Sequence, residues 1–271
     1  MMTMKLPLFR IELALTIGLV LFNFTPVQAE PIESNIIAQS LSFNSRRQLN
    51  ETIIFNAPPP PDDINAPGNR VGGGKRGCEN MDNQRRGAID KPLTALVPVY
   101  KLKDSEVVLG LTTASHPTFW FYVPYLPKVN AEFVLQDAAD WTVYKTPVLL
   151  SKTPGVFSFS LPSIASPLEI GKRYHWYFNI YCNQQQPPVF VDGWIQRELL
   201  NPTLKSQLAT ATPKQRVALF AAQGFWYEAL TTAAEIRRTN PQDIDWVAML
   251  QSVGLDNIAL EPMVKCCQPG N

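Results

Sequence analysis

Glycine spacing is the feature of this sequence that most resembles a cofactor site. Gly72, Gly74 and Gly77 satisfy the pattern G-x-G-x-x-G, which binds the pyrophosphate of a dinucleotide when a strand precedes it and a helix begins after it. The pattern lies instead between Pro67 and Cys78, in a stretch rich in turn residues. We therefore interpret it as a linker.

A phosphate-binding loop of the Walker type is the second nucleotide site to consider, because a lysine follows these glycines. That loop needs a Ser or Thr hydroxyl directly after its lysine to hold magnesium, and a glycine five residues before the Gly-Lys pair. Here Lys75 is followed by Arg76, and Asn69 stands at the position of the first glycine. The residue types exclude this site.

The chain has few histidines that could act in catalysis. There are two histidines and neither a G-x-S-x-G nor an H-E-x-x-H motif, the patterns of α/β-hydrolases and zinc proteases. We interpret His116, which precedes Pro117, and His175, within an aromatic strand, as structural. The carboxylates that could form a glycosidase pair are Glu132, Asp137, Asp140 and Asp192. We predict no catalytic residue, no cofactor and no metal site, and thus a protein that is not an enzyme.

Four cysteines, Cys78, Cys182, Cys266 and Cys267, are the candidates for disulfides in an exported chain. A bond between the adjacent Cys266 and Cys267 needs a strained eight-membered ring. We therefore predict two bonds that join Cys78 and Cys182, in either order, to Cys266 and Cys267. A metal site that includes a histidine is the weaker alternative, because no C-x-x-C spacing is present.

The first 29 residues have the pattern of a secretory signal peptide. Lys5 and Arg10 precede an apolar run at 13–24, and Val27-Gln28-Ala29 places small or slim residues where signal peptidase cleaves. A membrane span needs about 20 apolar residues, so this run is too short. We predict cleavage after Ala29, no membrane span in the mature protein, and a periplasmic, outer-surface or secreted location.

Composition indicates a folded protein without bulk attraction to nucleic acid. Apolar residues make up 45% of the chain and charged residues 17%, with a formal net charge of +1, so no strong field acts on polyanions. The 24 prolines favour extended strands and rigid connectors. Residues 30–86 combine prolines with glycines, and we predict a flexible tether there.

Short β-type runs separated by turn residues occupy the next zone, and we predict a β-sandwich domain over 87–200. The expected strands are 93–100, 107–112, 118–125, 131–137, 141–145, 156–161, 173–182 and 189–198. About eight strands without a helical period between them indicate an antiparallel sandwich of the immunoglobulin or fibronectin type. At the start of the seventh strand, Tyr174 follows a turn in the manner of a tyrosine corner, in which the buried hydroxyl bonds to backbone slightly upstream.

The period becomes helical from residue 201, and we expect helices at 213–222, 225–238 and 242–253. Gly224, Trp226, Ala229 and Pro241 fit the spacing of a tetratricopeptide repeat. One such repeat cannot bury its own apolar face. We therefore predict that residues 201–271, a short tetratricopeptide-like segment and a cysteine-containing tail, dock on the sandwich.

Large rings on both faces of two strands are the feature that could carry recognition. Trp120 and Tyr122 alternate with phenylalanines in one strand, and Tyr177 and Tyr181 with other rings in another. Either the helical segment covers the second face, which we favour, or these four residues form an exposed binding surface.

Several longer motifs resemble one known family. The motifs are RVGGGKRGC at 70–78, LTALVP at 93–98, PTFWFYVPY at 117–125, YHWYF at 174–178, GWIQR at 193–197, FWYEAL at 225–230 and CC at 266–267. Together they resemble the cyanobacterial exported family catalogued as domain of unknown function 928. The resemblance implies an envelope or secreted location, and it implies no activity, ligand or catalytic residue.

These observations predict a non-enzymatic, exported cell-envelope protein that acts as a protein-interaction module, with an envelope or secreted protein as its partner. The alternative is a carbohydrate-binding module that recognises envelope or extracellular polysaccharide through Trp120 and Tyr122. A hydrolase of envelope polymers is the third hypothesis.

Overall fold

The fold is that of a computed structural model, which describes residues 53–61, 64, 67–73, 91–102, 105–124, 129–183 and 185–264. The predicted signal peptide and three of the four cysteines, Cys78, Cys266 and Cys267, lie outside these residues. None of the helices in the described ranges has the length and apolar character needed to cross a lipid bilayer.

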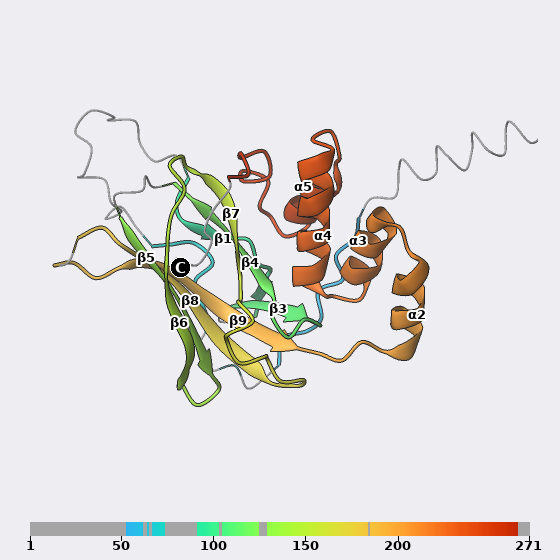
Figure 1. The fold of residues 1–271 in the computed structure, drawn as a ribbon, viewed down its shortest axis with the longest axis horizontal. Coiled ribbons are helices and arrows are strands. Elements are labelled where there is room, and N and C mark those ends of the chain that lie inside the picture. Colours follow the sequence, from blue (N-terminus) through green and yellow to red (C-terminus); the bar gives the residue numbers. More distant parts are fainter. Residues whose placement is uncertain are drawn as a thin grey trace, which may run out of the picture. The chain divides into compact units, whose positions relative to one another are not determined.

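Nine strands in the described residues form two sheets (Figure 1). The smaller sheet has the order β1 (Thr94–Ala95), β4 (Thr118–Val123), β7 (Gly155–Ser160). The larger has the order β2 (Val99–Lys101), β3 (Glu106–Thr112), β9 (Val189–Arg197), β8 (Arg173–Tyr181), β5 (Asn130–Asp137), β6 (Thr142–Val148). The mainly β fold is confirmed.

One strand pair corrects the expectation of a fully antiparallel sandwich. β3 and β9 run parallel, with Leu109 opposite Trp194 and Thr112 opposite Arg197. A hairpin forces two neighbouring strands to be antiparallel, but most of the β domain separates these two strands in the sequence. Their relative direction is therefore set by packing.

Aromatic side chains fill the space between the two sheets. Phe121 of β4 stacks on Phe178 of β8 with ring centroids 4.5 Å apart, and Phe133 of β5 lies 4.4 Å from Phe159 of β7. Along β8, side chains that point between the sheets alternate with side chains that point outward, because a strand has a two-residue period. At its start, the Tyr174 hydroxyl accepts a hydrogen bond from the Glu169 N–H at 3.1 Å, which confirms the bond predicted for the tyrosine corner.

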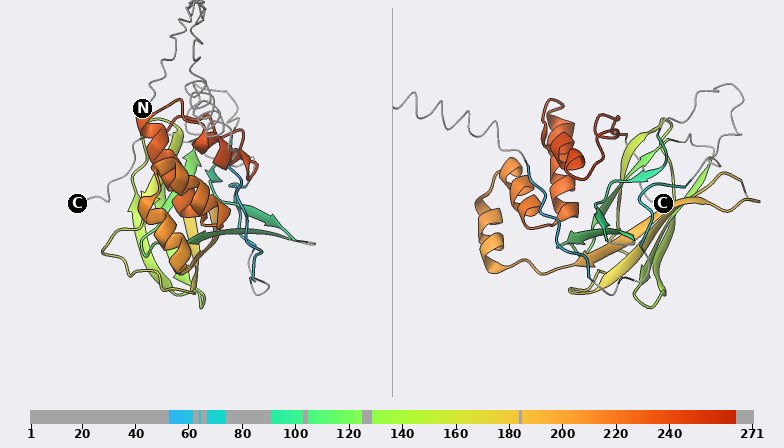
Figure 2. Two further views of the ribbon diagram at one scale, coloured as in Figure 1. Left: turned by 90° about the vertical axis from the view of Figure 1, so that its right-hand side faces the viewer. Right: turned by 180° about the vertical axis from the view of Figure 1, so that it is seen from behind.

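Four helices follow the strands and gather on one side of the sheets (Figures 1 and 2). They are α2 (Pro202–Thr210), α3 (Pro213–Ala222), α4 (Trp226–Thr239) and α5 (Asp245–Gln251). α3, α4 and α5 match the predicted helices, whereas α2 was not predicted. Its signal is the Asn201-Pro202 pair, in which Asn201 caps the helix by accepting from the Leu204 N–H and proline occupies the first turn.

The helices cover the outer face of the smaller sheet. The Trp120 indole N–H donates to the Thr231 hydroxyl of α4 at 3.0 Å, and its ring lies 5.3 Å from that of Trp246 in α5. The Trp226 indole N–H donates to the Leu96 carbonyl at 2.7 Å. One continuous apolar core includes both sheets and the helices. The molecule therefore has three layers, with the smaller sheet in the middle.

Two pieces of the predicted flexible tether pack on this body. The backbone N–H of Asn56 donates to the Ala221 carbonyl at 3.0 Å, at the end of α3. The adjoining turn holds Gly224 at φ +77°, where a Cβ would lie 2.9 Å from the Asn56 carbonyl oxygen, so glycine is required there. Further along, Val71 forms a bridge with Thr94 at the free edge of β1. The tether is thus partly built into the fold.

The end of the described chain covers the opposite edge of the smaller sheet. The Val156 N–H donates to the Pro262 carbonyl, and the Val264 N–H donates to the Val156 carbonyl, each at 2.8 Å. This short pairing is parallel to β7. Both edges of the smaller sheet are therefore paired, which removes two free edges that could aggregate.

Buried tyrosines predict loss of stability at alkaline pH. Burial raises the pKa of Tyr100 and of Tyr227 well above the ordinary value near 10. Between the unfolded and the folded pKa the folded state binds more protons, so stability falls as pH rises above about 10, by about 1.4 kcal/mol per pH unit for each tyrosine. Ultraviolet titration should show these two rings ionising only as the protein unfolds. Reversible ionisation of all eight tyrosines in a chain with unchanged circular dichroism would contradict this.

Candidate functional site

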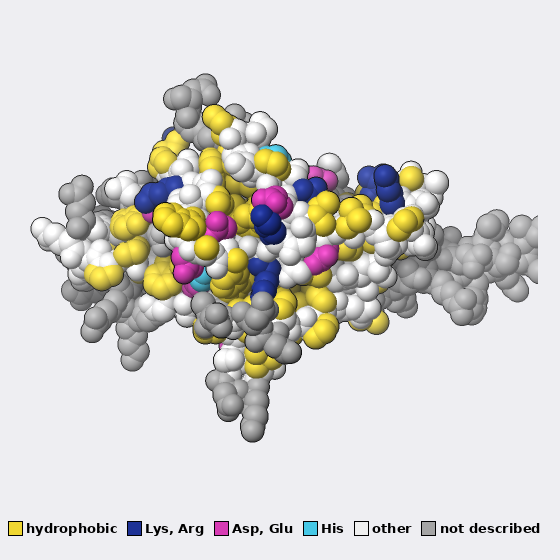
Figure 3. All heavy atoms as spheres, turned by 90° about the horizontal axis from the view of Figure 1, so that it is seen from below, with side chains coloured by type: hydrophobic (Ala, Val, Ile, Leu, Met, Phe, Trp, Pro, Cys, Tyr) yellow, Lys and Arg dark blue, Asp and Glu magenta, His cyan; other side chains and the backbone are white. Residues whose placement is uncertain are grey.

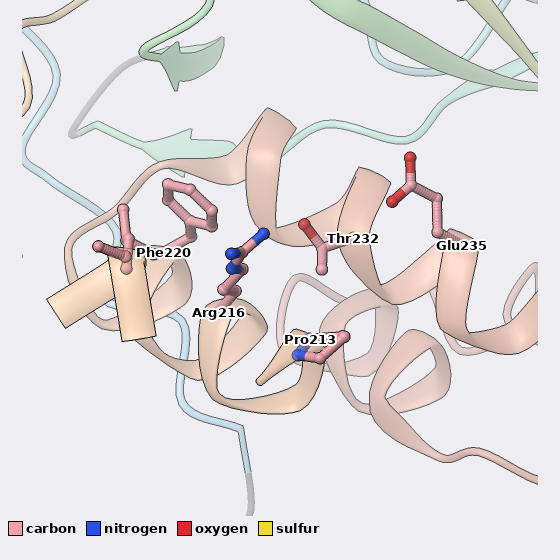
Figure 4. Close-up of a pocket in the computed structure, with 7 residues that line it drawn as sticks. Pro213, Arg216, Phe220, Thr232 and Glu235 are labelled. Atoms are coloured by element: carbon pink, nitrogen blue, oxygen red, sulfur yellow. The ribbon is translucent and has the colours of Figure 1, made fainter. Parts of the chain in front are cut away.

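A hollow in the described part of the molecule lies among α2, α3 and α4. It has a volume of about 390 Å³. Its lining residues are Leu208, Ala209, Pro213, Arg216, Phe220, Thr232 and Glu235. Figure 4 shows Arg216 and Phe220 extending from α3, while Thr232 and Glu235 come from α4.

A second hollow of about 170 Å³ continues the first toward the β3–β4 loop. Its lining residues are Ala114, His116, Pro117, Thr118, Phe220, Tyr227, Glu228, Thr231, Thr232 and Glu235. Phe220, Thr232 and Glu235 line both hollows. We refer to the two together as the α4 groove, and to the second hollow as its inner end.

The sequence of α4 explains why one face is polar and the other is buried. Glu228, Thr232 and Glu235 recur at a spacing of four and three residues, which aligns them on one side of a helix. Ala233 and Ala234 belong to the opposite side and are fully buried. The buried side packs on the sandwich, so the polar side is left to line the groove.

The groove carries opposite charges on its two walls. Arg216 on α3 and Glu235 on α4 are both exposed, and neither takes part in the ion pairs formed among the described residues. The side of the molecule seen in Figure 3 has acidic and basic side chains interspersed among hydrophobic ones. The groove walls therefore offer charges that a bound molecule could pair.

Glu228 is fixed at the inner end by an unusual number of hydrogen bonds. Its Oε1 accepts from the Thr112 hydroxyl at 2.6 Å, from the N–H and hydroxyl of Thr113 at 2.8 and 3.1 Å, and from the Ala114 N–H at 3.0 Å. Its Oε2 is buried and has no hydrogen-bond partner among the described residues. A buried polar atom without a partner costs about 1–3 kcal/mol, and the hydroxyl of Tyr227, which also lines the inner end, is a second such atom.

Replacing Glu228 by alanine is expected to lower the free energy of unfolding by about 2–4 kcal/mol, because the hydroxyl of Thr112 and the N–H of Thr113 lose their acceptor. Urea unfolding measures the change. Glu235→Ala, on the same face of α4 but exposed, is the matched control and should change stability by less than about 0.5 kcal/mol. Equal effects of the two substitutions would contradict the anchoring role of Glu228.

His116 lines the inner end but is occupied by structural bonds. Its Nδ1 lies 3.1 Å from the Ser115 hydroxyl, and its Nε2 lies 3.1 Å from the Ala165 carbonyl oxygen. Both ring nitrogens are thus used within the protein, in agreement with a structural role.

Trp120 and Tyr122, considered as an exposed binding surface in the alternative that we did not favour, are not exposed. Trp120 is 1% and Tyr122 is 6% exposed, because α4 and α5 cover their face of the smaller sheet. The helices therefore cover these two rings, as we favoured, and the alternative of an exposed surface is corrected for them. Tyr177 and Tyr181 lie apart from them, half-buried on the outer face of the larger sheet.

A buried polar network surrounds Tyr177. Its hydroxyl lies 2.9 Å from Nδ1 of His175, and Nε2 of His175 lies 2.7 Å from Oδ2 of Asp192. The other carboxylate oxygen of Asp192 accepts from the backbone N–H and the side-chain amide of Asn69, at 2.9 and 2.8 Å. Burial, and next the charge of Asp192, raise the pKa of Tyr177. The network fastens the segment around Asn69 to the sheet.

The four carboxylates considered for hydrolysis lie at three places on the larger sheet. Glu132 pairs with Lys145 at 2.9 Å, and Asp137 caps the β5–β6 turn, which includes Asp140. Glu132 on β5 and Asp192 on β9 have β8 between them and are offset by two residues, so their backbones are about 12 Å apart. In a glycosidase pair the two carboxyl groups are about 5–9.5 Å apart, and the backbone positions do not identify such a pair.

Metal and disulfide candidates can be placed only in part. No group of three or more His, Cys, Asp or Glu side chains is arranged to hold a metal within the described ranges. Cys182 directly follows β8 and is half-buried. Its predicted partners lie outside the described residues, so the pairing stays a prediction.

The fold and the groove define a class of mainly β proteins in which C-terminal helices cover one sheet and present a groove on their outer side. The chain belongs to the family described as Domain of Unknown Function (DUF928), whose model matches residues 71–263. The match includes both sheets and α2 to α5, and it confirms the family indicated by the motifs. No curated protein matches the chain.

Proposed function

We propose that this chain is a non-enzymatic, exported protein-interaction module of the cell envelope, and that its α4 groove binds an extended segment of a partner protein. The observation that supports the proposal is the groove itself, which is open, continuous over two hollows and flanked by the exposed charges of Arg216 and Glu235. Export rests on the predicted signal peptide at 1–29, and the cyanobacterial envelope on the resemblance to exported proteins.

Strand order supports an immunoglobulin-like type for the sandwich. The succession β9-β8-β5-β6 follows the order G-F-C-C′ of a variable-type sheet, and β1-β4-β7 follows A-B-E. The tyrosine corner at Tyr174 lies at the start of β8, which corresponds to strand F. In the same proposal, α3 and α4, joined at Gly224, form a single tetratricopeptide-like hairpin. Its apolar face packs on the sandwich, where a neighbouring repeat would otherwise pack.

A blocked groove tests the proposal. Residues 30–271 serve as bait in a pull-down from envelope and medium fractions of the producing cells, beside Ala209→Trp, which places an indole in the larger hollow. Ala138→Trp, at the exposed β5–β6 turn, is the matched control. We expect a saturable protein partner that the wild type and Ala138→Trp retain and Ala209→Trp loses. Equal retention by all three baits would contradict binding in the groove.

Carbohydrate binding is the second candidate, and the outer face of the larger sheet favours it. Tyr177, Tyr181 and Phe190 lie there beside Glu132 and Asn179, and aromatic rings next to polar groups suit a sugar polymer. Loss of polysaccharide retention in Phe190→Ser, with no loss in Ala209→Trp, would favour this function. A hydrolase of envelope polymers remains the third hypothesis.

A further inference from the structure

The inner end of the α4 groove has an excess of acidic oxygens. Glu228 and Glu235 both line it, together with the hydroxyl-bearing side chains of Thr118, Thr231 and Thr232. Its lining includes no lysine or arginine. The electrostatic complement of this hollow is therefore a cation.

The hydrogen bonds of Glu228 indicate what kind of group would complement this charge. The Oε1 atom accepts from four donors at the end of β3 and in the loop that follows it, so the carboxylate is held in place. The Oε2 atom is buried without a hydrogen-bond partner among the described residues. A carboxylate oxygen only accepts hydrogen bonds, so the missing partner is a donor, and a charged donor forms the stronger bond.

Neighbouring basic groups do not supply this donor. Arg216 lines only the larger hollow, and the Arg238 guanidinium lies over the Trp120 ring, 5.1 Å from its centroid. The two ring nitrogens of His116 contact Ser115 and Ala165. Among the described residues these basic groups do not pair with Glu228, so we assign the complementary cation to a bound molecule.

The size of the inner end fits the end of one side chain. Its volume is about 170 Å³, and a cavity of roughly 150 Å³ holds a molecule as large as benzene. The ammonium group of a lysine or the guanidinium of an arginine, with part of its aliphatic stem, occupies such a space. Both groups donate several hydrogen bonds and carry a positive charge.

We propose that the partner segment places a lysine or arginine side chain in the inner end of the α4 groove, where the carboxylates of Glu228 and Glu235 attract its charged group. This inference rests on the proposed function, because it names the residue type by which a partner protein is recognised. The larger hollow, with Arg216 on its wall, then receives the neighbouring residues of the same segment.

A random peptide display library is the probe. Peptides are selected on residues 30–271, counter-selected on Ala209→Trp to retain groove binders, and then synthesised with each lysine or arginine replaced by norleucine. We expect a basic residue at one position in the selected peptides, and a loss of affinity of about tenfold or more on its replacement.

Isosteric variants assign the contact to the two carboxylates. Glu228→Gln and Glu235→Gln should each weaken the same peptides by about tenfold, and the basic preference should disappear among peptides selected on either variant. Glu106→Gln removes the same charge at an exposed position of β3 and should leave affinity unchanged. Melting temperatures close to that of the wild type show that each variant is folded.

Two results would overturn the inference, and they are distinguishable. Groove-dependent peptides that have no basic preference, or that bind Glu228→Gln and Glu235→Gln as tightly as the wild type, would refute the cation site and leave the proposed function standing. Failure to select any peptide that depends on an open groove would refute both.

Discussion

Ending the chain at Leu200 is expected to abolish cooperative thermal unfolding and to produce strong binding of a hydrophobic dye. The deletion removes α2 to α5 and uncovers the outer face of the smaller sheet. Trp120 and Tyr122 are 1% and 6% exposed in the intact chain, and aromatic side chains bury roughly 150–250 Å² each. At about 25 cal/mol per Å², uncovering two rings costs roughly 8–12 kcal/mol. That cost is comparable with the whole stability of a domain, about 5–15 kcal/mol.

A point substitution tests the packing of the helices on the sandwich without removing part of the chain. Trp226→Ala removes a fully buried indole and its hydrogen bond to Leu96, and should lower the free energy of unfolding by about 3–5 kcal/mol. Trp141→Ala is the matched control, because Trp141 is 73% exposed, and it should change stability by less than about 0.5 kcal/mol. An unchanged melting profile and unchanged dye binding in the shortened chain would show that the sandwich folds without its helices.

Reducing the protein is expected to lower the free energy of unfolding by about 3–5 kcal/mol for each disulfide, since each bond closes a long loop. Topology supports the predicted bonds. Cys182 follows β8 directly, and Tyr181 stands opposite Asn130 at the start of β5. The chain on the N-terminal side reaches the same end of the sandwich, because a Cβ on Gly72 would lie 3.1 Å from Val189, which pairs with Ile180.

The last described residues of the chain also lie near the end of the sandwich where β8 ends and β5 begins. Val264 bonds to Val156, next to the end of β4 at Val123. Cys78 is five residues beyond Gly73 and Cys266 is two beyond Val264, spans of at most about 18 and 7 Å. Peptide mapping without reductant should show Cys182 bonded to Cys266 or Cys267, and Cys182→Ser should lose one bond. Alkylation of Cys182 in the unreduced, unfolded protein would contradict the prediction, as would a bond between Cys266 and Cys267.

Local patterns account for the elements that sequence reasoning predicted well. Strand period and turn residues were sufficient for β8, whose inward and outward residues alternate as expected, and for the Tyr174 bond. They were not sufficient for the parallel pairing of β3 with β9, because the direction of a distant strand is a property of tertiary packing. The helix-start signal at Asn201-Pro202 was present and was missed.

The groove could not have been predicted in the same way. In the sequence, nothing distinguishes Glu228 from the other carboxylates. Its role depends on hydrogen bonds that Thr112, Thr113 and Ala114 donate to it across the contact between the end of β3 and the first turn of α4. Nothing local to either segment indicates that encounter. Conversely, Trp120 and Tyr122 have the composition of a binding surface, and only the position of α4 and α5 shows that their partners are within the chain.

The contact between Asn56 and the end of α3 has a consequence for the order of folding. The side-chain amide of Asn56 also donates to the Ala222 carbonyl, 166 positions away, so the first described segment is fixed by residues far along the chain. Contacts of such long range form late and slow the folding of a domain. The turn they hold, at Gly224, sets how α3 meets α4. We therefore expect the two walls of the groove to reach their final arrangement only after residue 56 has met the end of α3.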